Sequence, residues 1–362
     1  IVKLMLENNG FTIIDLGRDV PPEKIVETVK SEKASAVALS ALTRRDVTVT
    51  RIRQGRPNPG LAPQHVTALR AVAELASAEV TGLEAGSSRI GFRPGDLRGG
   101  EHHFDVGTAG SITLVLQACL PVAFAASEAT RLRVVGGTDV QWSPPLDYFA
   151  RVFLPLIRRI GGQADILSHR RGYYPRGGGE VEIVVQPTTA WFPLQLTDPG
   201  AVERVRGTAH VSNLSGEIPK RMKQAAVRRL HGVSDVKIEE RVYPGEEAVG
   251  QGGALVLWVE REHALLGASS LAERGKPSER VGEEAAAALD AEILSNATVD
   301  LHGADQIVAY LALADRPSSF LVREVTGHLR TMAWLIPQFL GRTIEFQGIG
   351  DLTRVKVGGP SA

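Results

Sequence analysis

Short glycine-rich turns recur along the 362-residue chain, between segments patterned as strands and segments patterned as helices. Examples lie at residues 107–111, 136–139 and 177–179. Glycine reaches backbone conformations that other residues adopt only with strain, so such turns favour short, alternating elements. The 38 glycines and 20 prolines agree with many turns and argue against a helical bundle. We therefore expect an α+β fold of repeated α/β units, and not one doubly wound sheet.

The balance of charge and the scarcity of cysteine exclude several classes of protein. The 41 basic residues equal the 41 acidic ones, so any binding of nucleic acid has to use a local patch and not a field spread over the molecule. Cys119 is the single cysteine, which excludes a disulfide framework and a cysteine-ligated zinc site. At about 100–200 residues per domain, the length predicts about two domains.

One apolar stretch raises the question of a membrane span. Residues 106–127 carry no charge, and these 22 residues are long enough to cross a bilayer. Pro121 interrupts the stretch, and a proline inside a helix removes a hydrogen bond. We therefore expect a buried helix over residues 111–120, no membrane span and a cytoplasmic protein.

A basic, turn-rich loop at residues 51–60 is the first candidate binding site. Residues 44–56 hold five arginines against one acid, Asp46. The guanidinium group is a planar fork that matches the oxygens of a phosphate, so the loop suits phosphate recognition. A solvated turn is the alternative that the pattern leaves open. Directly after the loop, apolar residues on one face predict a helix over residues 64–76.

The N-terminal segment differs in composition from the rest of the chain. Residues 1–33 hold four lysines and one arginine, whereas the remaining 329 residues hold five lysines and 31 arginines. The segment resembles the cobalamin-binding domain of corrinoid proteins and methionine synthases over "IVKLMLENNGFTIIDLGRDVPPEKIVETVKSEKASAVALSAL", residues 1–42. In that family an Asp-x-His-x-x-Gly motif supplies the histidine that binds cobalt. The segment lacks this motif, so we do not expect cobalamin binding.

A second resemblance covers about residues 38–357. The motifs that carry it are, in chain order, "RIRQGRPNPGLAPQHVTALRAVAEL", "FRPGDLRGG", "DVGTAGSITLVLQACLP", "VVGGTDVQWSPPLDYFARVFLPLIRRIG" and "GYYPRGGGEVEI". They resemble the RNA 3′-terminal phosphate cyclase family. The resemblance implies a large domain of three repeated α/β units, with a smaller α/β domain inserted into it.

The same resemblance implies the domain boundaries. Residues 38–186 and 277–357 would form the large domain, residues 187–276 the inserted small domain, and residues 1–37 a foreign corrinoid-protein-like fragment. Members of the family begin with a strand and a glycine-rich turn, and this sequence holds only the ending of that segment, Ala38–Thr43. We therefore expect the first repeat to be incomplete, with the junction of the two parts inside this hexamer.

The junction segment carries two conflicting patterns. As a helix over Ala36–Thr43 it would turn its apolar side chains toward the core. As a strand, Ser35–Leu39 would pair beside Phe11–Leu16. Alanine and leucine dominate the segment and favour a helix, which is the structure that we expect.

The resemblance to the cyclases implies a nucleotidyl transfer that uses ATP. A histidine attacks the α-phosphate and becomes adenylylated, AMP passes to the 3′-phosphate of an RNA, and the neighbouring 2′-hydroxyl closes a 2′,3′-cyclic phosphate. His328, in "VTGHLRTMAWLIPQFL", matches the family's nucleophile motif. Neutral imidazole is nucleophilic, and its pKa of ~6.5 leaves it mostly neutral at pH 7. Gly327 fits a tight strand-to-helix turn, and a helix N-terminus would further favour the neutral ring.

The resemblance also implies which residues hold the substrates. Those expected to hold the terminal phosphate of the RNA are Arg53, Arg56 and Gln64. Those expected to hold ATP are Gln117 and a loop formed by His302, Gly303, Ala304, Asp305 and Gln306. Asp305 is expected to orient His328 or a metal, and a helix N-cap is its alternative role. A divalent cation, Mg or Mn, is expected with the triphosphate. Its carboxylate in the family lies in the missing N-terminal turn, so no metal ligand is named.

Two alternative functions stay open at this point. One is a non-catalytic, cyclase-like RNA-binding protein of ribosome assembly, against which His328 speaks, because those relatives lack the nucleophile. The other is a corrinoid-binding protein, against which the missing cobalt histidine speaks. The incomplete first repeat puts the competence of the enzyme in question, because the missing turn would supply metal and phosphate contacts.

Overall fold

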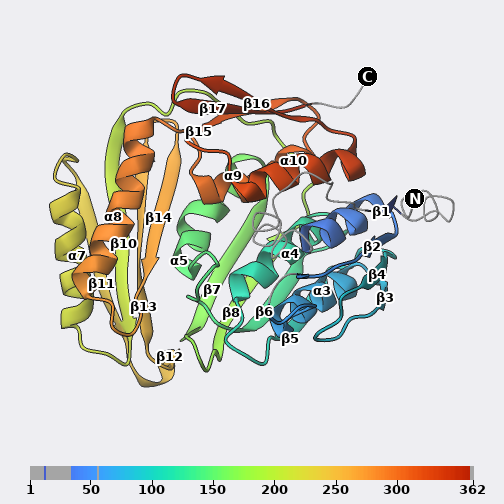
Figure 1. The fold of residues 1–362 in the computed structure, drawn as a ribbon, viewed down its shortest axis with the longest axis horizontal. Coiled ribbons are helices and arrows are strands. Elements are labelled where there is room, and N and C mark those ends of the chain that lie inside the picture. Colours follow the sequence, from blue (N-terminus) through green and yellow to red (C-terminus); the bar gives the residue numbers. More distant parts are fainter. Residues whose placement is uncertain (1–11, 14–33, 55–56, 359–362) are drawn as a thin grey trace.

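The computed structural model describes residues 12–13, 34–54 and 57–358. Within them the chain forms four β-sheets with helices packed on their faces, as Figure 1 shows. The expected α+β class is confirmed. The fragment expected at residues 1–37 lies outside the described residues except for 12–13 and 34–37. No helix in the described ranges is long and apolar enough to cross a membrane.

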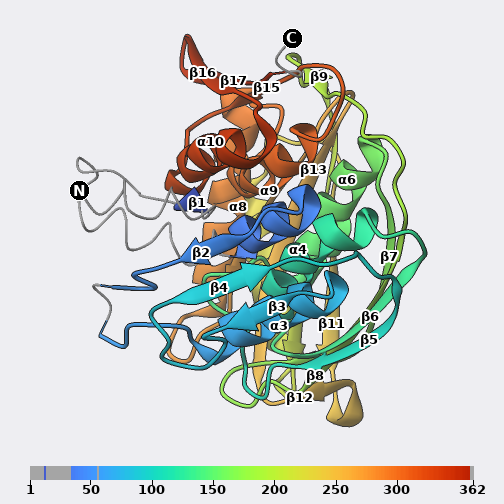
Figure 2. The same ribbon diagram turned by 90° about the vertical axis from the view of Figure 1, so that its right-hand side faces the viewer.

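The first sheet is small and carries the junction segment on one face. Its strands, in spatial order, are β1 (Thr12–Ile13), β2 (Val47–Val49), β4 (Ile90–Arg93) and β3 (Glu79–Thr81). The helices that accompany it are residues 34–43 and α3 (Pro63–Leu75). The first two strands run parallel, and the other pairs are antiparallel. Figure 2 views the molecule with this sheet toward the reader.

The junction segment is helical from residue 34 to residue 43, which confirms the expected helix over Ala36–Thr43. Ala38 and Leu39 are buried as expected, and Leu42 packs against the core from its edge. The alternative pairing of Ser35–Leu39 with the N-terminal strand is wrong. The strand β1 pairs instead with β2, through Thr12 opposite Val47. Burial of one apolar face and the high helix propensity of alanine here favour the same structure.

The second sheet has longer strands. In spatial order they are β12 (Ala248–Val249), β7 (Gln163–Gly172), β8 (Gly179–Gln186), β6 (Thr130–Gly136) and β5 (Gly100–Asp105). Its helices are α4 (Ile112–Phe124), α5 (Leu146–Tyr148) and α6 (Leu154–Arg159), the last two joined by a π-helical turn at Phe149–Phe153.

The apolar helix α4 differs from the expected helix at its C-terminal end. It continues through Pro121 to Phe124, four residues past the expected end at Leu120. Proline removes one backbone hydrogen bond from the ladder. Val122, Ala123 and Phe124 are buried, and the apolar surface that they remove from water offsets that loss.

The third sheet and the helices beside it close the top of the molecule in Figure 1. Its strands, in spatial order, are β9 (Gln195–Leu196), β15 (Ser318–Val322), β17 (Leu352–Val357) and β16 (Ile344–Ile349). Its helices are α9 (Leu301–Leu311) and α10 (Gly327–Leu340). Tyr310 on α9 packs edge-on against Phe124 of α4, with ring centroids 6.1 Å apart, so the second and third sheets share one core.

The fourth sheet lies at the opposite side of the molecule from the first. Its strands, in spatial order, are β11 (Val236–Tyr243), β10 (Val202–Ser212), β13 (Gly252–Arg261) and β14 (Leu265–Leu271). Helices α7 (Glu217–Arg229) and α8 (Ser278–Ser295) pack against each other and against this sheet. Most of the expected insert, residues 187–276, thus forms a sheet of its own, whereas β9 and β12 pair with strands of other sheets. The division into two domains stays a prediction.

Candidate active site

A cleft of about 2480 Å³ lies where the layers meet. Its walls come from the helix at residues 34–43, from α3, α4, α9 and α10, and from the segments that follow β6 and β7. The expected site residues that line it are Arg53, Gln64, Gln117, His302, Asp305, Gln306 and His328. Gly303 and Ala304 are buried inside α9 and do not line the cleft, and Arg56 lies outside the described residues.

The first turns of α3, α4, α9 and α10 are among those that line this cleft. Lining residues from those turns are Gln64 of α3, Ser111 before α4, His302 of α9 and His328 of α10. The N-terminus of a helix carries unsatisfied N–H groups and a partial positive charge of about half a unit. Their convergence makes the cleft a site for a polyanion.

His328 is the second residue of α10, directly after Gly327. The helix is capped by Thr326, whose hydroxyl accepts a hydrogen bond from the N–H of Leu329 at 3.0 Å. The imidazole is half-buried and lines the cleft. The ring thus lies at the positive end of the helix dipole.

Asp305 is linked to the cap of α10. The hydroxyl of Thr326 donates a hydrogen bond to Oδ1 of Asp305. Thr326 therefore joins α9 to the start of α10, two residues before His328. The alternative role of Asp305 as a helix N-cap is wrong, because Asp305 lies inside α9.

The segment from His302 to Gln306 was expected as a loop, and the structure shows it as the first turns of α9. The residue that caps this helix is Asp300, which accepts hydrogen bonds from the N–H groups of His302 and Gly303 at 3.1 and 2.9 Å. The cap satisfies donors that a loop would leave to solvent, so the helix begins at Leu301.

Asp300 also anchors α9 to two other elements. Its Oδ1 accepts a hydrogen bond from the hydroxyl of Tyr148 at 2.6 Å, and its Oδ2 accepts one from the N–H of Gly267 at 3.0 Å. Burial, and then the charge of Asp300, raise the pKa of the Tyr148 hydroxyl well above its usual value. Asp300 is not among the residues predicted from the sequence, although an aspartate just before an apolar helical pattern is an N-cap signal.

Two glutamine side chains in the cleft present buried polar atoms. Gln117 lies on α4 and Gln306 on α9. Within the described part of the chain, Nε2 of Gln117 and Oε1 of Gln306 are buried and accept or donate no hydrogen bond. An unsatisfied buried polar atom costs about 1–3 kcal/mol. A ligand that offers an acceptor to Gln117 and a donor to Gln306 would remove that cost.

Two residues of the arginine loop, the basic segment at residues 51–60, have a strained backbone. Arg51 and Arg53 have φ values of 55° and 52°, in the left-handed region. Ile52 between them is fully buried and is tied by backbone hydrogen bonds to Ser88 and Gly60 at 3.1 and 2.8 Å. This anchor holds the loop in place although each left-handed residue costs roughly 1–2 kcal/mol.

Of the described arginines in the loop at residues 51–60, Arg53 lines the cleft. Nη1 of Arg53 donates to the carbonyl of Gly60 at 3.0 Å. Gln64 lies at the start of α3, in close contact with Gly110. A Cβ at Gly110 would lie 2.8 Å from the Cβ of Gln64, so glycine is needed there for the turn before α4 to approach α3.

The described residues do not form a metal site by themselves, since they hold no cluster of three or more histidine, cysteine or acidic side chains suited to a metal. Of the acids in the cleft, Asp139 is bonded to Thr138 and Arg171, and Asp305 is bonded to Thr326. The residues present therefore do not define the ligands of a divalent cation.

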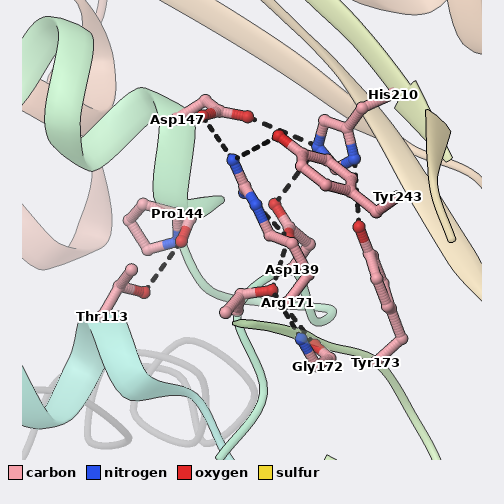
Figure 3. A network of polar contacts seen from close by, with 10 residues as sticks. Thr113, Asp139, Pro144, Asp147, Arg171, Gly172, Tyr173, His210 and Tyr243 are labelled. Carbon is pink, nitrogen blue, oxygen red and sulfur yellow. Dashed lines mark hydrogen bonds and ion pairs between the residues drawn. The ribbon is translucent and has the colours of Figure 1, made fainter. Parts of the chain in front are cut away.

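A buried polar network borders the cleft and joins the second and fourth sheets (Figure 3). Arg171, at the end of β7, donates to Asp147 at 2.7 Å and to Asp139 at 3.3 Å. Nε2 of His210 on β10 lies 3.4 Å from Asp147 and 3.6 Å from Asp139. Nδ1 of His210 meets the hydroxyl of Tyr173 at 3.0 Å.

Nearby positive charge stabilises the ionised form of Asp139 in this network. Burial alone would raise the pKa of Asp139, but Arg171 and then His210 hold it well below its usual value. A buried ion pair of this kind is costly to break, because either charge left alone is desolvated without a partner. The network therefore fixes how the fourth sheet sits against the cleft.

Comparison with known proteins gives a consistent match. The model of the family "RNA 3′-terminal phosphate cyclase" matches residues 34–346. A protein of that name from Nitrosospira multiformis is 48% identical over 322 residues, which cover 89% of this chain and 91% of the relative. The namesake from Pyrococcus furiosus is 40% identical over 325 residues, covering 89% and 94%. The namesake from Methanopyrus kandleri is 42% identical over 320 residues, covering 87% and 91%.

Proposed function

Because the chain belongs to the RNA 3′-terminal phosphate cyclase family, we propose that it converts the 3′-phosphate of an RNA end into a 2′,3′-cyclic phosphate and consumes ATP in doing so. The observation that carries this proposal is the meeting of several helix N-termini, Arg53 and His328 in one cleft. ATP and an RNA terminal phosphate are both polyanions, and the cleft is large enough for the two together.

His328 is the nucleophile in the first step. A ring nitrogen of the neutral imidazole attacks the α-phosphorus of ATP, a P–N bond forms, and the P–O bond to pyrophosphate breaks. The imidazole releases its proton, and pyrophosphate leaves with the bonding electron pair. The start of α10 suits this role because it disfavours the imidazolium form, which cannot attack.

The RNA end reacts in the second and third steps. An oxygen of the 3′-phosphate attacks the bound AMP, the P–N bond breaks, and His328 is released. The neighbouring 2′-hydroxyl then attacks the RNA phosphorus, AMP leaves, and the cyclic ester closes. Arg53 and Gln64 hold the RNA phosphate during both steps, together with Arg56 of the same loop.

The nucleotide is held by the opposite wall. Gln117 donates to it and Gln306 accepts from it, which satisfies the two buried atoms. His302 contacts the nucleotide from the first turn of α9, and Asp305 positions α10 through Thr326. The buried Gly303 and Ala304 let α9 pack closely behind this wall. ATP enters with Mg or Mn, for which we assign no protein ligand.

Protein adenylylation tests the proposal. The protein is incubated with ATP labelled at the α-phosphate and a divalent cation, without RNA. We expect acid-labile label on the wild type and none on His328→Ala. The exposed His103 supplies the matched control, since His103→Ala should take label like the wild type. A wild type without label would favour the non-catalytic RNA-binding relative.

The architecture adds three finer proposals. Apart from β12, which adds an edge strand to the second sheet, the first three sheets share one strand order, in which two parallel strands are followed by the fourth and then the third. We take them as three repeats of one unit, with residues 38–186 and 277–357 as the large domain and 187–276 as the insert. Residues 1–37, most of which lie outside the described residues, are the corrinoid-like fragment, and we propose that they bind no cobalamin. An unchanged absorbance spectrum of added cobalamin is the expected result.

A further inference from the structure

Two exposed aromatic side chains stand at the cleft. Trp142 is 81% exposed and Tyr174 is 77% exposed, and both line the cleft. Other large apolar side chains on the surface of the described residues lie away from it; these are Leu167, Phe192, Val227, Val242 and Leu294. Exposed aromatic rings gathered at a binding site indicate contact with a ligand.

The two rings come from neighbouring segments. Trp142 follows β6 and Tyr174 follows β7, and both strands flank β8 in the second sheet. The two segments are joined where they leave the sheet, since the N–H of Thr138 donates to the carbonyl of Gly172 at 2.8 Å. Both aromatic residues therefore lie beyond the same end of one sheet.

Fixed contacts hold each segment in place. The hydroxyl of Thr113 donates to the carbonyl of Pro144 at 2.8 Å, next to the turn that carries Trp142. Tyr173, which precedes Tyr174, is buried and meets His210 in the network of Figure 3. The aromatic rings are thus exposed on a rigid support, which lowers the entropy lost on binding.

Trp142 adopts a strained backbone. Its φ is 61°, in the left-handed region, which a bulky residue enters only with strain. Burial of the ring does not compensate this strain, because the side chain is exposed. Backbone strain of this kind gathers at functional sites, where the position of a side chain matters more than local stability.

Two arginines accompany the aromatic rings. Arg176 and Arg274 are exposed, line the cleft, and form no hydrogen bond or ion pair within the described ranges. The acid Glu273 lies beside Arg274 and also lines the cleft. Proteins that bind single-stranded nucleic acid combine such cations, which contact the phosphates, with aromatic rings, on which bases stack.

We propose that Trp142 and Tyr174 stack on bases of the nucleotides at the 3′ end of the RNA, while Arg176 and Arg274 contact their phosphates. This inference rests on the proposed function and adds the part of the substrate beyond the terminal phosphate. Stacking needs unpaired bases, so the surface selects a single-stranded 3′ end over a base-paired one. Binding by stacking accepts any RNA sequence, because every base has a face on which an aromatic ring can stack.

RNA binding by defined variants tests the inference. The probe is a single-stranded 3′-phosphate oligonucleotide, and its dissociation constant is measured by fluorescence anisotropy. Trp142→Ala and Tyr174→Ala are each expected to bind about 10-fold more weakly. Trp142→Phe keeps an aromatic face, so its affinity for the RNA should fall much less. Phe192→Ala removes an exposed ring outside the cleft and should bind like the wild type. Binding of both alanine variants within twofold of the wild type would overturn the inference.

A second set of probes separates stacking from a general loss of structure. An oligonucleotide with an abasic site near its 3′ end should bind the wild type more weakly. If stacking is responsible, the affinity for this abasic oligonucleotide should fall little further when Trp142→Ala or Tyr174→Ala is introduced into the protein. Fully additive losses for every abasic position would overturn the inference.

Two controls distinguish this inference from its premise. Adenylylation by labelled ATP without RNA should be unchanged in Trp142→Ala and Tyr174→Ala. A wild type that takes no label contradicts the proposed function, yet the binding measurements still decide about the aromatic surface. If light scattering showed that Trp142→Ala dissolves a dimer while RNA affinity stays unchanged, the surface would be an interface between copies and the inference would be wrong.

Discussion

The hydroxyl of Thr326 donates a hydrogen bond to Oδ1 of Asp305 and accepts one from the N–H of Leu329. One side chain thus caps α10 and ties it to α9. His328 lies in the chain between Thr326 and Leu329, so both hydrogen bonds help to fix its position. Under the proposed function, Asp305 would position His328 through Thr326 and the helix that it caps.

Removal of this link should affect stability and chemistry together. Thr326→Ala loses the cap, and we expect the free energy of unfolding to fall by about 1 kcal/mol. The rate of adenylylation should fall as well, because the start of α10 is less well fixed. Thr326→Ser keeps the hydroxyl and should retain most of both. Chemical denaturation and single-turnover labelling measure the two effects, and an alanine variant with an unchanged rate would remove the positioning role.

Arg53 should distinguish a 3′-phosphate from a 3′-hydroxyl. Arg53→Ala is expected to lose about 1.5–3 kcal/mol of binding to phosphate-ended RNA, the value of a hydrogen bond to a charged group. Binding to a hydroxyl-ended RNA should change little. Arg51→Ala is the matched control, since Arg51 has the same backbone conformation but does not line the cleft. Equal losses on both RNA ends would make Arg53 a general backbone contact.

Glu292 should make stability depend on pH. The side chain is 3% exposed, and burial, followed by the charge of Asp300, raises its pKa from 4.5 to about 7. The folded state therefore binds the proton more tightly than the unfolded state, so ionisation of Glu292 favours unfolding. Stability should fall as the pH rises from about 4.5 to about 7, by on the order of 2 kcal/mol from this group.

Glu292→Gln provides the comparison for that effect. The amide oxygen can still accept the hydrogen bond that Nε of Arg323 donates at 2.9 Å, and it does not ionise. The free energy of unfolding of this variant should depend less steeply on pH over the same range. Parallel pH profiles for the two proteins would show that Glu292 has no raised pKa.

Arg171 should be the most costly residue to replace in the network of Figure 3. Arg171→Leu leaves the buried Asp139 and the half-buried Asp147 without their cation. We expect the free energy of unfolding to fall by about 3–5 kcal/mol. Arg170→Leu removes a neighbouring arginine whose Nε donates only to the carbonyl of Gly178. In the same denaturation experiment, Arg170→Leu should lower the free energy of unfolding by about 1 kcal/mol. Equal losses for the two variants would show that the network contributes no more than a single hydrogen bond.

The sequence predicted the parts that depend on local pattern. Helix α3, the start of α10 at Gly327 and the helical junction segment follow from apolar spacing, turn residues and propensity. The resemblance to the cyclase family implied which residues would hold the substrates, and most of the described ones line one cleft. Of these, the seven that line it come from segments up to 275 residues apart, between Arg53 and His328.

Features that depend on distant partners were not predicted. Arg171 and His210 are ordinary residues of strands until the fold brings them to Asp139. The passage of α4 through Pro121 depends on burial, which local rules about proline do not contain. The strain at Trp142 is a backbone conformation that its residue type disfavours, so no propensity would assign it.

The cyclisation reaction itself tests the central claim most directly. A single-stranded RNA with a labelled 3′-phosphate is incubated with the protein, ATP and a divalent cation, and is then treated with alkaline phosphatase. A 2′,3′-cyclic phosphate resists the phosphatase, whereas a 3′-phosphate releases its label. We predict phosphatase-resistant label that requires ATP and disappears in His328→Ala. Label that stays fully sensitive with the wild type, or resistant label that forms equally with His328→Ala, would contradict the account.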